Sequence, residues 1–160
     1  MTEPVLYSAC LLGVRCAYDG RDRSHRLLDV PLPSGVLPVP VCPEQLGGLP
    51  TPRVPAEILE GTGKDVLDGT ARVVSRKGRD VTSAFLRGAE EVVRIGRALG
   101  CRRAVFSEGS PSCGSGWIYA GRFDGTRRPG CGVAAAALRA AGIAVSSSGG
   151  GEGSGGEERA

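Results

Sequence analysis

The feature that most constrains the fold of this chain is a cysteine placed just beyond each of three short hydrophobic segments. Each segment has the length and composition of a buried β-strand. The last cysteine lies in a loop, residues 110–116, whose proline and glycines disfavour helix and strand. Because ligands bind at the carboxyl ends of strands in open α/β sheets, parallel neighbours would bring all three thiols to one edge. The segments are residues 5–9, 36–41 and 103–107, and the cysteines that follow them are Cys10, Cys42 and Cys113.

Helical patterns alternate with these strands. Residues 81–99 carry apolar side chains at helical spacing, with Asp80 placed to cap the first turn and Gly100 placed to end the helix. An alanine-rich helix is expected at residues 132–141, followed by a last strand at 143–145. Strands alternating with helices predict an α/β fold, a small single domain with a mainly parallel sheet flanked by helices.

Two further segments and the chain end complete the predicted organisation. Residues 42–53 contain prolines and glycines that predict a rigid loop suited to holding a site, and residues 71–74 predict a strand in a hairpin or at an edge. A chain of 160 residues is long enough for one domain with its own core. We expect this domain to span residues 1–146, and the Gly/Ser-rich residues 147–160 to form a disordered tail.

Charge and hydropathy limit the partners of the chain. Its 20 basic side chains nearly balance 17 acidic ones, giving a formal net charge of +3, so we expect no long nucleic acid as a partner. No apolar run is long enough to span a bilayer, and the N-terminus lacks the features of a signal peptide. The sequence therefore predicts a cytoplasmic protein without membrane association, and its oligomeric state stays open.

Six cysteines in a chain without an export signal favour thiols or metal ligands over disulfides, because the cytosol keeps thiols reduced. The chain has no C-x-x-C pair of the kind that structural zinc sites use, and His25 is its single histidine. Three isolated thiols on three loops suit an iron–sulfur cluster in which one iron has no protein ligand. Such an iron is a Lewis acid with affinity for sulfur.

Four motifs stand in order along the chain: SACLLG at residues 8–13, YDG at 18–20, CPEQLGGLPTPR at 42–53 and SPSCG at 110–114. Together they resemble the family of small bacterial proteins related to thiouracil desulfidases, over residues 8–146. The resemblance implies a [4Fe-4S] cluster held by Cys10, Cys42 and Cys113. It also implies an open fourth iron that takes sulfur from a small thiolated nucleobase, with hydrolytic release of the oxo-base and sulfide.

The resemblance further implies catalytic roles for Glu44 and for a serine of the Cys113 loop. Glu44, two residues after Cys42, is placed to act as general acid and base. We assign the serine role to Ser112, beside Cys113, in preference to Ser110. A thiocarbonyl sulfur bound to the open iron makes its carbon more electrophilic, so water can add without any change in the oxidation state of the base.

Other interpretations stay open at this point. The thiols also suit a zinc- or sulfide-binding module without turnover, or a redox protein that uses Cys10 and Cys16 as a dithiol. Cys16 is equally suited to join the site or to lie outside it, whereas Cys101 and Cys131 are expected to be structural. The substrate stays open among free thiouracil, a nucleoside and a thiolated base in RNA.

The remaining candidate residues also have two interpretations each. Glu44 is suited to catalysis or to a simple ion pair with Arg53. Arg53 is suited either to a solvent-exposed position or to contact with the substrate or with Glu57. Trp117 and Tyr119 follow the last cysteine loop in an expected strand. Their rings are suited to stacking on a planar base or to ordinary packing, and packing is the more common role.

Overall fold

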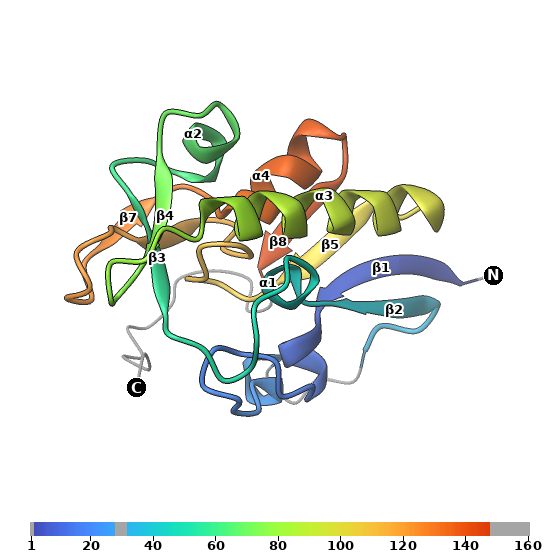
Figure 1. Cartoon of the computed structure of the whole chain (residues 1–160). Coiled ribbons are helices and arrows are strands. Elements are labelled where there is room, and N and C mark those ends of the chain that lie inside the picture. The colour runs from blue at the N-terminus through green and yellow to red at the C-terminus, as the bar shows by residue number, and fades with distance from the viewer. Residues whose placement is uncertain (1, 28–31, 148–160) are drawn as a thin grey trace.

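The computed structural model describes residues 2–27 and 32–147 of the chain, and a four-stranded parallel sheet in the order β2-β1-β5-β8 forms its centre (Figure 1). Strand β8 includes Ser147, the first residue of the expected tail, and the rest of that tail lies outside the described residues. The predicted small α/β domain with a mainly parallel sheet is confirmed. The strands are β1 (Glu3–Ser8), β2 (Val36–Val41), β5 (Arg103–Phe106) and β8 (Ala144–Ser147).

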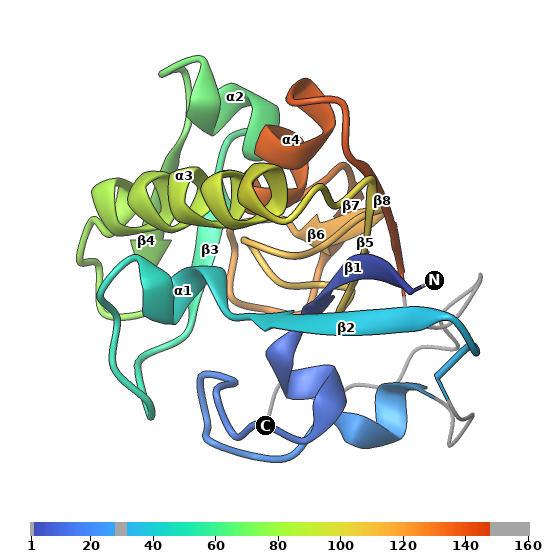
Figure 2. The same ribbon diagram turned by 90° about the vertical axis from the view of Figure 1, so that its right-hand side faces the viewer.

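Two long helices, α3 (Thr82–Ala98) and α4 (Val133–Ala140), lie side by side over one face of the sheet (Figure 2). Both expected helices are confirmed, each one residue shorter at either end. Asp80 Oδ1 accepts a hydrogen bond from the Thr82 N–H at 2.9 Å, as a capping side chain does. Gly100 has a φ of 69°, the left-handed conformation expected where a helix ends.

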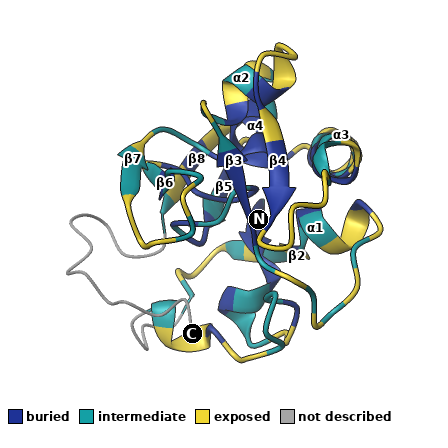
Figure 3. Cartoon of the chain, turned by 60° about the vertical axis from the view of Figure 1, so that its left-hand side comes forward, coloured by how far each residue is buried: buried dark blue, intermediate teal, exposed yellow. Residues whose placement is uncertain are grey.

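The amphipathic pattern of α3 explains its position. Phe85, Ala89 and Val92 are buried and recur at helical spacing, so one side of the helix packs into the core. Figure 3 shows the buried residues concentrated in the strands and on the inner sides of the helices. Leu99, expected to extend the apolar stripe, is instead exposed beyond the end of the helix.

Within the part of the chain that the structure describes, two antiparallel hairpins and four short helical segments complete the fold. The strand expected at residues 71–74 is confirmed as one strand of the first hairpin. The loop expected at residues 42–53 instead begins with a helical turn, because Pro43 is favourable at the start of a helix. The hairpins are β3 (Ala56–Leu59) with β4 (Arg72–Ser75) and β6 (Trp117–Tyr119) with β7 (Arg127–Pro129). The helical segments are α1 (Pro43–Leu46), α2 (Gly63–Leu67) and the 3₁₀ turns η1 (Ala9–Leu12) and η2 (Ser24–Leu27).

Strand β2 lies at an edge of the sheet and pairs with β1 along its whole length. An edge position tolerates Pro38 and Pro40, which have no N–H to donate to a second neighbour. Ser8 is in register with Val41, so β1 and β2 end at the same level. The residues that follow both strands therefore emerge together at one edge of the sheet.

Helix α1 is held in place by direct backbone contact with α3. A Cβ atom at Gly88 would lie 1.9 Å from the carbonyl oxygen of Pro43, and one at Gly47 would lie 2.0 Å from the carbonyl oxygen of Ala84. Neither position leaves room for a side chain, so glycine allows the two helices to approach this closely. This contact fixes the start of α1 relative to the core.

Candidate active site

The thiols predicted as ligands all lie beyond the carboxyl ends of neighbouring parallel strands. Cys10 lies in the 3₁₀ turn that follows β1, Cys42 immediately precedes α1, and Cys113 lies in the loop after β5. The thiols of Cys42 and Cys113 interact electrostatically with each other and with the Glu44 carboxylate. The structure thus brings Cys42, Cys113 and Glu44 into one site.

Cys16, which the sequence left undecided, lies at the same site and connects Cys10 to it. Its side chain is buried, and its thiol lies close enough to those of Cys10 and Cys42 for both to affect its pKa. The hydrogen bond with Cys10 is the main cause that raises the pKa of Cys16 to about 11, while the one with Cys42 acts in the opposite direction. The Cys42 Sγ also lies 3.7 Å from the Cys16 carbonyl oxygen as a hydrogen-bond donor.

The pKa values of the Cys42 and Cys113 thiols are raised, which favours their protonated forms. The hydrogen bond with Cys16, followed by burial, raises the pKa of Cys42 far above its usual range. Burial also raises the pKa of Cys113 to about 12, although hydrogen bonds from Ser8 and Ser112 act against it. A bound cation would reverse this preference, because metal ligands are thiolates and the metal supplies the compensating positive charge.

Glu44 connects the Cys42 and Cys113 loops through its carboxylate. Its Oε1 accepts a hydrogen bond from Arg53 Nε at 3.0 Å, and its Oε2 accepts one from Ser112 Oγ at 2.9 Å and one from Ser110 Oγ at 3.3 Å. The pair with Arg53 is well shielded, since only 6% of the Arg53 side chain and 15% of the Glu44 side chain is exposed. Glu44 therefore both pairs with Arg53 and faces the Cys113 loop.

The hydrogen bonds of Ser110 and Ser112 define which atoms their hydroxyl groups donate to. Ser110 Oγ accepts the backbone N–H groups of Ser112 and Cys113, both at 3.1 Å, which occupies its two acceptor sites. It must therefore donate its own proton, to Ser112 Oγ at 2.9 Å or to Glu44 Oε2. Ser112 Oγ in turn donates to Glu44 Oε2 and lies 3.7 Å from Cys113 Sγ. Ser112 thus stands between the carboxylate and the thiol.

Arg53 links this carboxylate to two further segments. Its Nη1 donates to Thr51 Oγ1 at 2.9 Å, its Nη2 donates to the Cys16 carbonyl at 2.8 Å, and its backbone N–H donates to the Tyr18 carbonyl at 2.8 Å. The contact of Arg53 with Glu57 considered from the sequence stays a prediction. Glu57 accepts hydrogen bonds from backbone N–H groups of the loop between β6 and β7.

The N-terminus of α4 holds the Cys113 loop in place. Its first N–H groups donate to the carbonyls of Pro111 and Ser112, at 2.8 Å and 2.9 Å. Gly132 allows this approach, since a Cβ there would lie 2.5 Å from the Ser112 carbonyl carbon. These contacts were not predicted from the sequence. The one sequence feature that could have indicated them is the glycine before the alanine-rich helix.

Glu108 closes the other end of the same loop. Its Oε1 accepts hydrogen bonds from the Ser115 backbone N–H and from Ser115 Oγ, the latter at 2.8 Å, and from the Gly116 N–H at 3.0 Å. The role of this carboxylate was also not predicted, because nothing in the sequence spacing of Glu108 indicates that its side chain accepts hydrogen bonds from its own loop.

Trp117 and Tyr119, together with Cys101 and Cys131, pack against neighbouring side chains. The Arg127 guanidinium stacks 3.8 Å from the Trp117 ring centroid, and Tyr119 meets the Trp117 ring edge-on at 5.3 Å, so these rings pack against neighbours in the structure. Cys101 is buried in the hydrophobic core and Cys131 packs against it. Both positions agree with the structural roles expected.

Thiols on three separate loops suit a multinuclear group, in which each cysteine binds a different metal ion. Within residues 2–27 and 32–147, no three histidine, cysteine or acidic side chains are grouped as the ligands of one ion would be. In a cluster each cysteine binds a different iron, so thiols on separate loops suit it. Within the same residues, no helix has both the length and the apolar character needed to span a bilayer.

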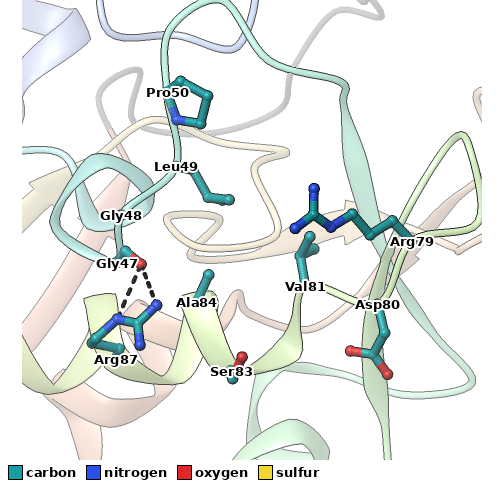
Figure 4. Close-up of a pocket in the computed structure, with 10 residues that line it drawn as sticks. All are labelled: Gly47, Gly48, Leu49, Pro50, Arg79, Asp80, Val81, Ser83, Ala84 and Arg87. Carbon is teal, nitrogen blue, oxygen red and sulfur yellow. Dashed lines mark hydrogen bonds between the residues drawn. The ribbon is translucent and has the colours of Figure 1, made fainter.

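A separate pocket with a volume of about 270 Å³ lies between the segment that follows α1 and the start of α3 (Figure 4). Arg87 lines it and donates two hydrogen bonds to the Gly47 carbonyl, at 3.1 Å and 2.8 Å. The thiols, Glu44 and Ser112 are absent from its lining. The pocket is therefore distinct from the site at the sheet edge.

Fold and site together define a class of protein, the small α/β proteins that gather cysteine thiols and a partly buried carboxylate at the carboxyl edge of a parallel sheet. A family model described as 2-thiouracil desulfurase matches residues 5–149. The chain therefore belongs to the 2-thiouracil desulfurase family, which confirms the resemblance found in its motifs.

Two similar proteins agree with this assignment. The Bacillus subtilis (strain 168) protein YbbK is 43% identical over 145 residues, which cover 88% of this chain and 93% of YbbK. A solved structure of the [4Fe-4S]-dependent thiouracil desulfidase TudS is 42% identical, with a TM-score of 0.75 and 91% of each chain covered. The similarity in both cases extends over nearly the whole length of the chains.

Proposed function

We propose that this chain is a [4Fe-4S]-dependent desulfidase that removes sulfur from a thiolated nucleobase such as thiouracil by non-redox hydrolysis. Membership of the 2-thiouracil desulfurase family and similarity to TudS support this activity. The observation that carries the proposal is the hydrogen bond of 2.9 Å between Ser112 Oγ and Glu44 Oε2, which joins two cysteine loops through a proton-transfer pair. Water replaces sulfur in the reaction, so a C=S bond and H₂O give C=O and H₂S.

Cys10, Cys42 and Cys113 are the proposed ligands of the cluster. Their three separate loops suit three different irons, and cysteines bind iron as thiolates. With three protein ligands, such a cluster supplies one Lewis-acidic iron for the sulfur of the substrate.

Glu44 and Ser112 are the proposed catalytic residues. Glu44 Oε2 takes a proton from the attacking water while the water oxygen forms the new bond to carbon. Arg53 holds Oε1 at 3.0 Å throughout, so the other oxygen stays directed towards the Cys113 loop. Ser112 then passes the proton from Glu44 to the ring nitrogen or the departing sulfur, since its hydroxyl lies between Glu44 and Cys113.

The substrate that suits this site best is a small thiolated base, free or as a nucleoside, rather than a long nucleic acid. The near balance of 20 basic and 17 acidic side chains offers little attraction for a polyanion. We place the activity in the cytoplasm, where reducing conditions keep six cysteines free.

A Glu44→Gln variant tests the proposal. After anaerobic reconstitution with iron and sulfide, we expect the wild type to release sulfide from thiouracil. The variant should keep its iron content and visible absorption, but its turnover should fall by about 100-fold or more, because the amide cannot accept the water proton.

The matched control is Glu90→Gln, which changes an exposed residue of α3 and should leave turnover unchanged. A panel of thiolated bases and nucleosides run with the same preparation identifies the substrate class. A cluster-loaded Glu44→Gln protein with normal turnover would remove Glu44 from the mechanism.

A further inference from the structure

We propose that the pocket between the segment that follows α1 and the start of α3 is a binding site for a small aliphatic dianion, such as a dicarboxylate. The pocket has a volume of about 270 Å³, and two arginine side chains, Arg79 and Arg87, line it (Figure 4). The binding itself does not depend on the proposed function, because neither the thiols nor Glu44 belong to the lining.

Arg79 supplies the first cation. Two backbone contacts with Ser75 fix the turn that carries it: the Ser75 N–H donates to the Arg79 carbonyl at 2.8 Å, and the Arg79 N–H donates to Ser75 Oγ at 3.1 Å. Within the described part of the chain, the guanidinium itself has no hydrogen bond, ion pair or ring contact. Figure 4 shows the side chain extending over Val81 towards Leu49, into the pocket. All five N–H groups of this guanidinium are therefore available to an anion.

Arg87 supplies a second cation, and its position is fixed. Its Nε and Nη2 donate to the Gly47 carbonyl oxygen at 3.1 Å and 2.8 Å, which holds the guanidinium against the wall of the pocket. Its Nη1 has no partner among the residues that the structure describes. Because a guanidinium presents its N–H groups in one plane, a carboxylate can bind at the remaining edge without breaking the contact with Gly47.

The charge of the surrounding segment also favours an anion. Residues 72–87 contain five arginine or lysine side chains and one aspartate, a formal net charge of +4, whereas the whole chain carries +3. The aspartate, Asp80, already has partners: its Oδ1 accepts the Thr82 N–H at 2.9 Å, and its Oδ2 lies 3.6 Å from Arg72 Nη1. Positive charge is therefore concentrated around the pocket, which raises the local concentration of anions.

The apolar part of the lining indicates a ligand with a hydrocarbon chain between two charged groups. In Figure 4 the Leu49 and Ala84 side chains lie between the two guanidiniums, and Val81 and Pro50 also line the pocket. Apolar surface of this kind favours methylene groups, while each guanidinium matches a carboxylate or a phosphate with parallel hydrogen bonds. The volume is that of roughly nine water molecules, so it suits a molecule of the size of glutarate rather than a nucleotide.

A bound dianion would also stabilise the segment that positions Glu44. Leu49, in the wall of the pocket, donates its backbone N–H to the Glu44 carbonyl at 3.0 Å, and the Pro50 carbonyl accepts a hydrogen bond from Arg53 Nη1 at 3.1 Å. Residues 47–53 therefore contact both the pocket and the pair of Arg53 with Glu44. Occupation of the pocket should restrict this segment, so its amide groups should exchange with solvent more slowly.

Calorimetric titration of cluster-loaded protein, kept anaerobic in about 0.15 M salt, tests the binding. The probes are glutarate, propane-1,3-diyl bisphosphate and, as a monoanion of the same chain length as glutarate, valerate. We expect the wild type to bind a dianion at one site per chain and at least about tenfold more tightly than valerate. The preferred dianion shows whether the pocket selects carboxylate or phosphate groups.

Arg79→Gln should weaken dianion binding by at least about tenfold, because it removes one of the two cations. Arg79 is exposed and its side chain has no partner among the described residues, so this variant should fold as the wild type does. Arg94→Gln is the matched control, since it removes the same charge from the exposed surface of α3 outside the pocket. Glutarate should slow amide exchange at residues 47–53 in the wild type and in Arg94→Gln, but not in Arg79→Gln.

Equal affinities of the wild type, Arg79→Gln and Arg94→Gln would show a general attraction of charges and would contradict the inference. Absence of binding up to about 10 mM dianion would contradict it as well. Binding without slower exchange at residues 47–53 would exclude the effect on that segment. Dianion binding by a protein that releases no sulfide from thiolated bases would instead contradict the proposed function alone.

Discussion

At the scale of single residues, Arg53 has a larger role than neutralising Glu44. Its guanidinium donates from all three nitrogens, to Glu44 Oε1, to Thr51 Oγ1 and to the Cys16 carbonyl. Because the guanidinium is planar and rigid, these contacts set the relative positions of three segments at once. Arg53 is thus a positioning residue that acts through Glu44.

An Arg53→Lys substitution tests that role. Lysine keeps the positive charge but cannot reproduce the planar fork, so Glu44 loses its fixed orientation. We expect kcat for sulfide release to fall by about 10- to 100-fold while most of the cluster is retained. Arg94→Lys, on the exposed side of α3, is the control and should have wild-type kcat. Equal kcat in Arg53→Lys and wild type would show that charge alone is sufficient.

Asp19 of the YDG motif allows a test of pH dependence. Burial raises the pKa of Asp19, but hydrogen bonds from Arg23 and from the Arg21 backbone N–H outweigh it and hold the pKa below its usual value. The Arg23 Nη2 lies 2.6 Å from the carboxylate and is itself well buried. Because the folded-state pKa is lowered, the stabilisation is present above the unfolded pKa of about 3.9 and is lost as pH falls through the folded value.

We therefore expect Asp19→Asn to lower the free energy of unfolding by about 1 kcal/mol at pH 7. The difference from wild type should shrink as pH falls below about 4, because the wild-type carboxylate then becomes protonated. Urea unfolding of reduced, cluster-free protein at several pH values measures it. A difference that stayed constant down to about pH 3 would exclude the ion pair as its cause.

At the scale of helices and strands, glycine contacts determine where the site loops lie. Helix α1 approaches α3 at Gly47 and Gly88, and the start of α4 approaches the Cys113 loop at Gly132. In each case the neighbour is backbone, which cannot rotate away from an added side chain. These contacts fix the positions of two of the three segments that carry proposed ligands, those of Cys42 and Cys113.

Gly88→Ala and Gly96→Ala, both within α3, separate backbone contact from helix propensity. Each substitution favours the helix by about 1 kcal/mol through the higher helix propensity of alanine. The added Cβ at position 88, however, would lie 1.9 Å from the Pro43 carbonyl oxygen. At position 96 the nearest atoms are flexible side-chain ends at 3.1 Å and 3.2 Å. We expect Gly88→Ala to lower the free energy of unfolding by about 2 kcal/mol and to reduce iron uptake, because α1 is displaced.

Gly96→Ala should change the free energy of unfolding by less than about 1 kcal/mol and leave iron uptake intact. Chemical denaturation and iron analysis of the two variants measure both effects. Similar behaviour of the two would mean that the contact between α1 and α3 does not position the site.

The same scale shows which elements a single sequence reveals. The apolar stripe of α3 and the strand that precedes each predicted ligand were recognisable, since periodicity and length identify them. The short elements α2, β3 and β7 were missed, because three to five residues without a clear period carry little local signal. Their positions depend on partners elsewhere in the chain.

At the scale of the whole molecule, the convergence of strand ends was predictable and the detailed site was not. Alternating strands and helices imply a parallel sheet, and a parallel sheet brings the following loops to one edge. The contact between Glu44 and Ser112 joins residues 68 positions apart. No local pattern encodes it, nor the place of Cys16 beside Cys42, because both arise only when the sheet has assembled.

The most direct test of the whole account is the iron and sulfide content of anaerobically reconstituted protein, compared with Cys→Ser variants at positions 10, 42, 113 and 101. If the chain binds the cluster type of its neighbour TudS, wild type and the Cys101 variant should each hold about four irons and four sulfides per chain. The other three variants should lose most of both. A colourless wild type that holds one zinc ion, or full iron content in all four variants, would contradict the account.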